Sequence, residues 1–453
     1  MPIHPIEFRY GTEEMKDVWS QENRLKTLVQ TEIALAKAEA DLGIIPKKAA
    51  VEIEKTLPRV KWSRVDEIER EINHDMMAVI KAVSEQCKGD AGKWVHFGAT
   101  SNDILDTATA LQFKAATGIM EAKLCRLLSV LVKLSKEHKT TVCCGRTHGQ
   151  IGVPTTYGLK IAIWASEIDR HIDRLNELYP RIAVGQMTGA VGTQAAFGKN
   201  GIEIQKKTME YLGIGSVDVS NQLIQRDRHA EFVMWMAGVV TTLDKIGTEI
   251  RSMQRSEISE LEEGFGKKQV GSSTMPHKRN PIKSEQICGL ARIVRGFVET
   301  ELLNNTLWDE RDLTNSSAER IIFPEGCILA DHIINLGINV LENLRFNRAN
   351  IDRNLNLLDG LNMGEAVMIE LTLKGIGRQE AHEIVRSAAM KSVEEKIRFK
   401  DALLEDKELA AVLTEDDIKN LTDPYKYIGT ATEQVDNLNQ KLKAKYGNKI
   451  ETR

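Results

Sequence analysis

The hydrophobic positions in the middle of the chain repeat with the spacing of one helix face. Between residues 232 and 253, apolar side chains follow one another at alternating intervals of four and three residues. This period is typical of long helices that pack at shallow angles in a bundle. Four further stretches carry a similar stripe, and no strand-like alternation of any length interrupts them. The stripes, which predict five long helices, cover residues 124–134, 161–175, 232–253, 287–302 and 334–341.

The flanking segments predict shorter helices. Residues 19–42 form one predicted helix that Gly43 ends, and residues 65–86 form a second. Near the other end of the chain, residues 375–382 predict a helix-turn-helix joint, followed by a charged helix to about residue 400. These changes of pattern predict an all-α fold of three helical domains, 1–103, 104–352 and 353–453. The long helices have more apolar face than one bundle needs, so we expect an oligomer whose subunits share a larger bundle.

Composition and charge limit the function. The 453 residues have a net charge of −4, which gives no reason to expect nucleic acid or an anionic membrane as a partner. The N-terminus has no apolar core of a secretory signal, and the longest apolar stretch, residues 232–240, is too short to span a bilayer. Six cysteines without a Cys-x-x-Cys pair fit a reducing compartment. We therefore expect a cytoplasmic protein, and the lack of a zinc motif predicts no metal site.

Residues 271–281 carry the highest density of chemical groups in the chain. This run, Gly-Ser-Ser-Thr-Met-Pro-His-Lys-Arg-Asn-Pro, combines hydroxyls, an imidazole, an ammonium and a guanidinium with two prolines that prevent a continuous helix. Five cations and no acid lie between residues 264 and 284. A solvated linker is the alternative interpretation, but a linker does not need clustered cations or stiffening prolines. The run predicts a loop that closes over an anionic substrate.

Two histidines elsewhere are candidates for chemistry, each with a structural alternative. His148 follows Arg146 in the glycine-rich stretch 144–156, predicted as a connecting loop at a bundle end, where functional residues are frequent. His74 lies beside an apolar helical stripe, where a packed or surface histidine is the simpler explanation. The run Thr-Ser-Asn-Asp at 100–103 is explained equally well as a helix cap or as an anion site at a helix N-terminus.

The loop at 271–281 resembles the signature of the fumarase/aspartase superfamily, and His277 with Arg279 makes it most similar to the adenylosuccinate lyases. The carboxymuconate cycloisomerases carry a very similar run, whereas residues 363–390 are more similar to the adenylosuccinate lyases. The resemblance covers nearly the whole chain. It implies a homotetramer with a twenty-helix core, active sites shared between subunits, and no organic cofactor or metal.

The resemblance also implies roles for individual residues in a β-elimination that releases fumarate. Ser272 is the expected base, with Ser273 as the next candidate, and His148 is the expected acid that protonates the leaving nitrogen. The other expected catalytic residues are Lys278, which stabilises charge, Glu285, which partners the imidazole, and His74.

The expected substrate-binding residues belong to the same motifs. They are Arg9, Tyr10, Asn73, Asp75, His96, Thr100, Ser101, Gln222, Ser273, Asn280, Arg311, Ser316 and Arg320. Asn73 stands where the family has arginine, which puts one anion contact in doubt. The expected substrates are adenylosuccinate, giving AMP, and the succinylated imidazole-carboxamide ribotide of purine synthesis. The alternatives are another lyase of the superfamily, such as an argininosuccinate lyase or a carboxymuconate cycloisomerase, or a structural relative without catalysis.

Overall fold

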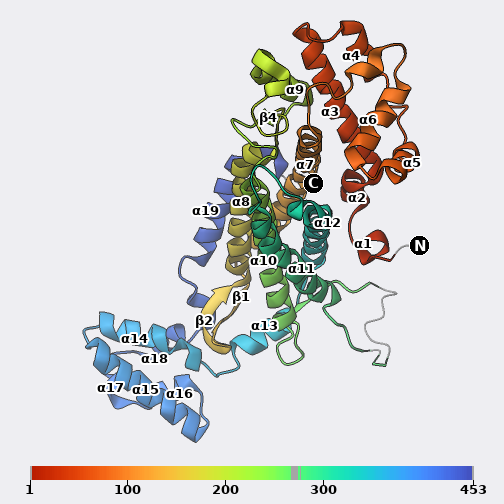
Figure 1. Ribbon diagram of the computed structural model, residues 1–453. Coiled ribbons are helices and arrows are strands. Elements are labelled where there is room, and N and C mark those ends of the chain that lie inside the picture. Colours follow the sequence, from red (N-terminus) through yellow and green to blue (C-terminus); the bar gives the residue numbers. More distant parts are fainter. Residues whose placement is uncertain (1–2, 267–273, 276, 451–453) are drawn as a thin grey trace. The chain divides into compact units, whose positions relative to one another are not determined.

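All five long helices are present in the computed structural model, which describes residues 3–266, 274–275 and 277–450 (Figure 1). The apolar stripe of residues 232–253 lies on one of them, and all seven of its side chains are buried. The prediction of an all-α fold is therefore confirmed. The five helices are α7 (Ser101–Glu137), α8 (Tyr157–Ile182), α10 (Asp227–Met253), α11 (Ile282–Asn304) and α12 (Thr314–Glu342).

The chain forms two compact units, and each long helix contributes residues to both of them. Unit 1 consists of Met1–Leu124, Arg170–Leu243 and Gly289–Asn335; unit 2 consists of Cys125–Asp169, Asp244–Cys288 and Leu336–Arg453. The predicted division into three domains at residues 103 and 352 remains a prediction.

Unit 1 contains the short N-terminal helices. Apolar side chains of α3 to α6 form one hydrophobic core with Ile204 and Met209 of α9. These helices are α1 (Pro5–Phe8), α2 (Glu13–Trp19), α3 (Gln21–Asp41), α4 (Lys47–Glu54), α5 (Trp62–Ile72), α6 (Asp75–Gln86) and α9 (Gly201–Leu212).

The prediction of a single helix over residues 65–86 is wrong. Asn73 has φ 50°, in the left-handed region, and its N–H bonds to the Glu69 carbonyl to close α5. Asparagine is one of the few residues that adopts this conformation readily. His74 is then extended, and its side chain accepts a hydrogen bond from the Met77 N–H at the start of α6. The apolar stripe continues across the break, so periodicity alone did not reveal it.

The prediction of a connecting loop over residues 144–156 is also wrong, because this stretch is a β-hairpin. Strands β1 (Val142–Thr147) and β2 (Gln150–Thr156) pair antiparallel, with a bulge between Cys144 and Arg146. His148 and Gly149 have φ of 54° and 77°, as the tight turn of a hairpin requires. The glycines and the proline of this stretch concealed the strands.

The C-terminal part of unit 2 has a hydrophobic core of its own, built from helices α14 to α18. The remaining helices are α13 (Arg348–Leu355), α14 (Gly364–Leu373), α15 (Arg378–Glu395), α16 (Phe399–Leu404), α17 (Lys407–Ala410), α18 (Glu415–Leu421) and α19 (Ala431–Tyr446). The remaining strands are the two-residue segments β3 (Val184–Gly185), β4 (Gly215–Ser216), β5 (Leu261–Glu262) and β6 (Arg345–Phe346).

Helix α12 is more apolar than the sequence analysis recognised. It has 29 residues and, of the described helices, it is the one that is long and apolar enough to cross a membrane by length and composition. However, 67% of its most apolar window is buried inside the protein, as in the core helix of a bundle.

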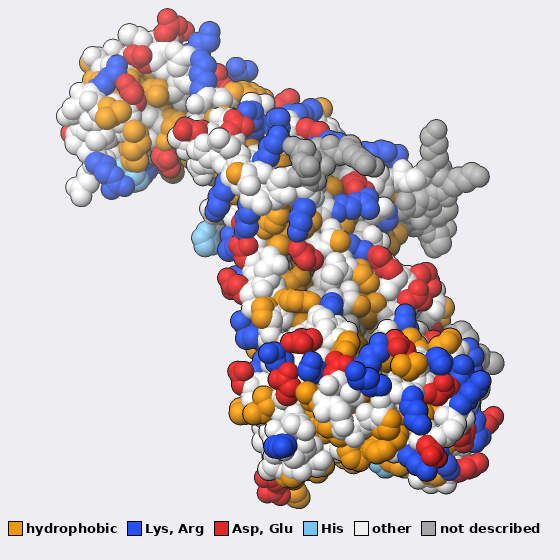
Figure 2. Space-filling view, turned by 90° about the horizontal axis from the view of Figure 1, so that it is seen from above, with side chains coloured by type: hydrophobic (Ala, Val, Ile, Leu, Met, Phe, Trp, Pro, Cys, Tyr) orange, Lys and Arg blue, Asp and Glu red, His pale blue; other side chains and the backbone are white. Residues whose placement is uncertain are grey.

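On the face shown in Figure 2, basic and acidic side chains are interspersed.

Candidate active site

A cavity of about 930 Å³ lies within unit 1. Its wall combines the α5–α6 junction, the start of α7, the segment before α10, and the start of α12 with the residues preceding it. Motifs far apart in the sequence therefore meet at one cavity. Eight predicted site residues line it: Asn73, His74, Asp75, Ser101, Gln222, Arg311, Ser316 and Arg320.

An ion pair connects two walls of this cavity. Arg320 Nη2 on α12 lies 2.5 Å from Asp75 Oδ2 at the start of α6. Burial opposes ionisation of Asp75, but the Met76 N–H and the Arg320 guanidinium outweigh it and lower the pKa of the carboxyl group. The pair therefore stays charged at neutral pH. His74 is exposed, so its imidazole is open to a ligand.

A hydrogen bond joins Gln222 and Arg311, which also line this cavity. Arg311 Nη1 donates to Gln222 Oε1 at 2.8 Å, and Gln222 Nε2 donates to the Ala190 carbonyl at 2.7 Å. The Nε of Arg311 is buried without a hydrogen-bond partner among the described residues. Burial lowers the pKa of Arg311. Gln222 thus orients the guanidinium group of Arg311, and the Nε–H of Arg311 stays available as a hydrogen-bond donor.

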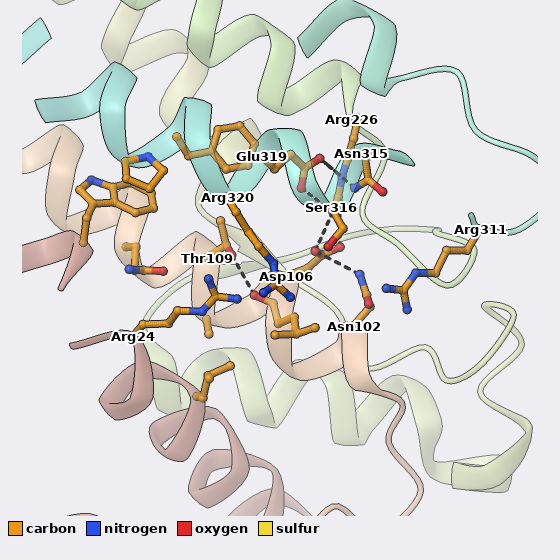
Figure 3. Close-up of a pocket in the computed structure, with 17 residues that line it drawn as sticks. Arg24, Asn102, Asp106, Thr109, Arg226, Arg311, Asn315, Ser316, Glu319 and Arg320 are labelled. Carbon is orange, nitrogen blue, oxygen red and sulfur yellow. Dashed lines mark hydrogen bonds and ion pairs between the residues drawn. The ribbon is translucent and has the colours of Figure 1, made fainter. Parts of the chain in front are cut away.

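Sequence reasoning missed a buried ion-pair triad at the side of this region (Figure 3). Arg226 makes two hydrogen bonds to Asp106, of 2.7 and 2.9 Å, and its Nε lies 2.8 Å from Glu319 Oε1. The triad links α7, the residue before α10, and α12. The Arg226 guanidinium outweighs the effect of burial and lowers the pKa of Asp106. Arg226 lies in the polar run of residues 225–229, but local spacing does not reveal which residues it pairs with.

Four predicted binding residues of unit 1 are not in the lining of the large cavity. His96 Nδ1 lies 2.7 Å from Glu32 Oε1, and this carboxylate outweighs burial and raises the pKa of the imidazole. The Thr100 N–H donates to Asp103. Arg9 and Tyr10 follow α1, where the Tyr10 ring lies 5.6 Å from the ring of His332.

Asp103 fixes the start of α7, where Ser101 reaches the cavity. The Asp103 carboxylate accepts hydrogen bonds from the N–H groups of Thr100, Thr188 and Gly189. Burial nevertheless raises its pKa to about 6. Asp103 therefore ties the helix start to the glycine-rich segment that continues into the cavity wall at Ala190.

The expected acid, His148, belongs to unit 2 and is exposed at the turn of the β1–β2 hairpin. Two residues before it, Arg146 Nη2 lies 2.5 Å from Glu260 Oε1. Glu260 is fully buried and also accepts from Tyr157 Oη at 2.5 Å and Asn354 Nδ2 at 2.9 Å. One buried carboxylate therefore anchors the base of the turn that carries His148.

Those residues of the expected lid that the structure describes also belong to unit 2. Lys278 and Asn280 precede α11, and Glu285 lies in its first turn, as predicted. Lys278 and Glu285 are exposed. Ser272 and Ser273 lie outside the described residues.

One group of described residues has the composition of a metal site. Ligand atoms of His229, Glu301 and Glu319 lie within 4.8 Å of one another. Glu319 already binds Arg226, and Glu301 accepts from Asn304. Burial and the neighbouring Glu319 raise the pKa of Glu301 to about 8. Because the Arg226 guanidinium already occupies Glu319, a second cation at this cluster would be repelled by it.

Comparisons with known proteins identify the family to which the chain belongs. A family model described as "Lyase" matches residues 7–296, and one described as "Adenylosuccinate lyase C-terminus" matches residues 360–438. The adenylosuccinate lyase of Methanocaldococcus jannaschii is 54% identical over 98% of this chain and 97% of its own length. That of Pyrococcus abyssi is 52% identical over 97% of both.

Solved structures extend the similarity. A fumarate lyase from Mesorhizobium sp. BNC1 superposes with a TM-score of 0.89 at 32% identity, covering 97% of this chain and all of that one. A 3-carboxy-cis,cis-muconate lactonizing enzyme from Pseudomonas putida has the same TM-score at 29% identity, covering 97% of this chain and 99% of that one.

The fold and these matches define a lyase of the fumarase/aspartase superfamily. The C-terminal match and the identity of 50% or more along nearly the whole chain are more specific. The chain belongs to the adenylosuccinate lyase family.

Proposed function

We propose that this enzyme cleaves adenylosuccinate to AMP and fumarate, and cleaves the succinylated imidazole-carboxamide ribotide of purine synthesis in the same way. The observation that carries this proposal is the 930 Å³ cavity, where eight residues from separate motifs converge. Its arginines, serines and amides suit a ligand with a phosphate group and hydrogen-bonding polar groups.

The nucleotide part of the substrate would bind along α12 and the residues before it. Arg311, Ser316 and Arg320 offer two guanidinium groups and a hydroxyl to its phosphate. Asn73 and Asp75 at the α6 start, Ser101 and Gln222 would contact the remaining polar groups, with His74 orienting the substrate. His96, Thr100, Arg9 and Tyr10 complete the proposed binding set.

The proposed chemistry is a β-elimination with two groups of opposite function. Ser272, as an alkoxide that Lys278 would stabilise, removes the proton next to a carboxylate, and His148 protonates the nitrogen as the carbon–nitrogen bond breaks. Lys278 and Asn280 stabilise the negative charge that develops on the carboxylate, which Ser273 also binds. Glu285 partners His148. These steps need no metal or cofactor.

We further propose a homotetramer in which several subunits contribute to each active site. The support is the apolar surface that unit 1 exposes on its long helices and their connection. Its large exposed side chains include Ile293, Leu302, Leu303, Trp308, Leu313 and Ile321. Orange apolar side chains are also visible between the charged ones in Figure 2. We also propose a cytoplasmic location, because six cysteines without a Cys-x-x-Cys pair fit a reducing compartment.

The activity itself is directly testable. Purified protein mixed with adenylosuccinate should release fumarate, which ultraviolet absorbance follows. Argininosuccinate and a carboxymuconate are the matched comparisons, because the superfamily includes enzymes for both. Turnover of either one, without turnover of adenylosuccinate, would contradict the proposed substrate.

A further inference from the structure

A smaller cavity, of about 100 Å³, shares Arg311, Ser316 and Arg320 with the large one. A single water needs roughly 10–15 Å³ of such space, so a group of phosphate size fits. Arg24 of α3, which no motif of the sequence analysis includes, also lines this smaller cavity (Figure 3).

The charges lining the smaller cavity do not balance. It contains four arginines and two acids, and both acids, Asp106 and Glu319, are engaged by Arg226. Arg320 has Asp75 as its partner, and Arg311 is bonded to the neutral amide of Gln222. The guanidinium groups of Arg24 and Arg311 therefore have no carboxylate partner within the described part of the chain.

The position of Arg24 is electrostatically unfavourable without an anion. Its side chain is partly buried, and burial together with the neighbouring Arg320 guanidinium lowers its pKa. Figure 3 shows the Arg24 and Arg320 side chains, from α3 and α12, ending next to each other. Asp75 and Glu69 offset this only in part, since Asp75 is bound to Arg320 and Glu69 has the smallest effect at Arg24.

We propose that Arg24 binds the phosphate group of the substrate together with Arg320 and Ser316. A phosphate dianion would be a counter-ion for the guanidinium groups that have no carboxylate partner, and a guanidinium presents several donors to its oxygens. The substrate carboxylates are the alternative anions. The phosphate is the favoured anion, because Arg311, Ser316 and Arg320, which the proposed function assigns to the phosphate, line the smaller cavity. Arg24 of α3 lines the same cavity.

This inference rests on the proposed function, and a pair of substrates tests it. Arg24→Met keeps the apolar stem and removes the charge. It should raise the KM for adenylosuccinate about 10- to 100-fold, the value of one charge-assisted hydrogen bond, with little change in kcat. The KM for the same substrate without its 5′-phosphate should not change. Arg24→Lys should recover part of the affinity, because it restores the charge without the fork of donors.

A matched control is Arg70→Met in α5, since Arg70 is exposed and paired with Asp66; both KM values should stay as in the wild type. An equal rise in KM for both substrates in Arg24→Met would overturn the proposal and indicate a structural role or a carboxylate contact. An unchanged KM for both substrates would overturn it as well. Calorimetric titration with AMP and with inorganic phosphate needs no turnover. Calorimetry therefore tests phosphate binding by Arg24 even if adenylosuccinate is not cleaved. Absence of cleavage would count against the proposed function alone.

Discussion

Two pairs of polar side chains around the large cavity hold one another in place. Asp75 holds Arg320, and Gln222 holds Arg311. Such contacts limit the number of rotamers of long side chains, so less conformational entropy is lost when a ligand binds. The cavity is in this sense preorganised for the proposed phosphate, although no single motif contains all of its parts.

Two substitutions test the proposed base and acid. Ser272→Ala should abolish turnover while binding of adenylosuccinate stays nearly intact, because the hydroxyl acts on the proton and not on substrate affinity. His148→Ala should lower kcat by about 10²-fold or more, as is typical for loss of a general acid. Stopped-flow absorbance and equilibrium binding separate the two effects.

The matched control for these variants is His382→Ala, since His382 is exposed on α15 and should have the wild-type rate. Wild-type turnover by Ser272→Ala would show that another group is the base, with Ser273 as the next candidate. A change in kcat for His382→Ala of the same size as for His148→Ala would remove the evidence for a specific acid.

At the scale of elements, the β1–β2 hairpin depends on the buried carboxylate of Glu260. Arg146, Tyr157 and Asn354 come from three different elements and all donate to it. Glu260→Gln replaces a charged acceptor by an amide of the same shape and leaves Arg146 without its counter-ion. Breaking a buried ion pair in this way typically costs about 3–5 kcal/mol. We expect faster hydrogen exchange over residues 142–156 and a lower kcat, because His148 loses its fixed position.

Glu249→Gln is the control for this prediction, because the Glu249–Lys160 pair of the same unit is partly exposed and such pairs contribute only about 0–1 kcal/mol. Hydrogen exchange in the hairpin should not respond to it. Unchanged exchange and turnover in Glu260→Gln would show that the hairpin turn is held by other contacts.

At the scale of the whole molecule, the proposed sharing of sites between subunits predicts complementation. Inactive Ser272→Ala and His148→Ala proteins, unfolded together in equal amounts and refolded, should regain activity. With random mixing, a site that takes the two residues from different chains is intact in roughly a quarter of cases. Each variant refolded alone should stay inactive.

The control for complementation is subunit exchange measured on the same samples with two tags. If mixed oligomers form but no activity returns, both residues of a site come from one chain and the shared arrangement is wrong. Recovery near a quarter of the wild-type rate would instead support sites assembled from different chains.

The sequence by itself determined the long helices, the family and most of the candidate site. Apolar stripes specify helices because a residue on the buried face recurs every three or four positions. The stripe of residues 232–253 is buried as predicted. Motif residues such as Asp75 and Arg320 were recognisable because the runs that contain them resemble motifs of the family.

Tertiary structure decided which of these residues meet and how the chain turns between them. The left-handed Asn73 breaks a helix that periodicity predicted as continuous, because one backbone conformation leaves no trace in an apolar stripe. Arg226 finds Asp106 and Glu319 across more than 90 positions of the chain, and Arg24 reaches the cavity from a helix without a motif. Long-range pairing of buried charges depends on where the helices lie side by side, and local spacing carries no information about that.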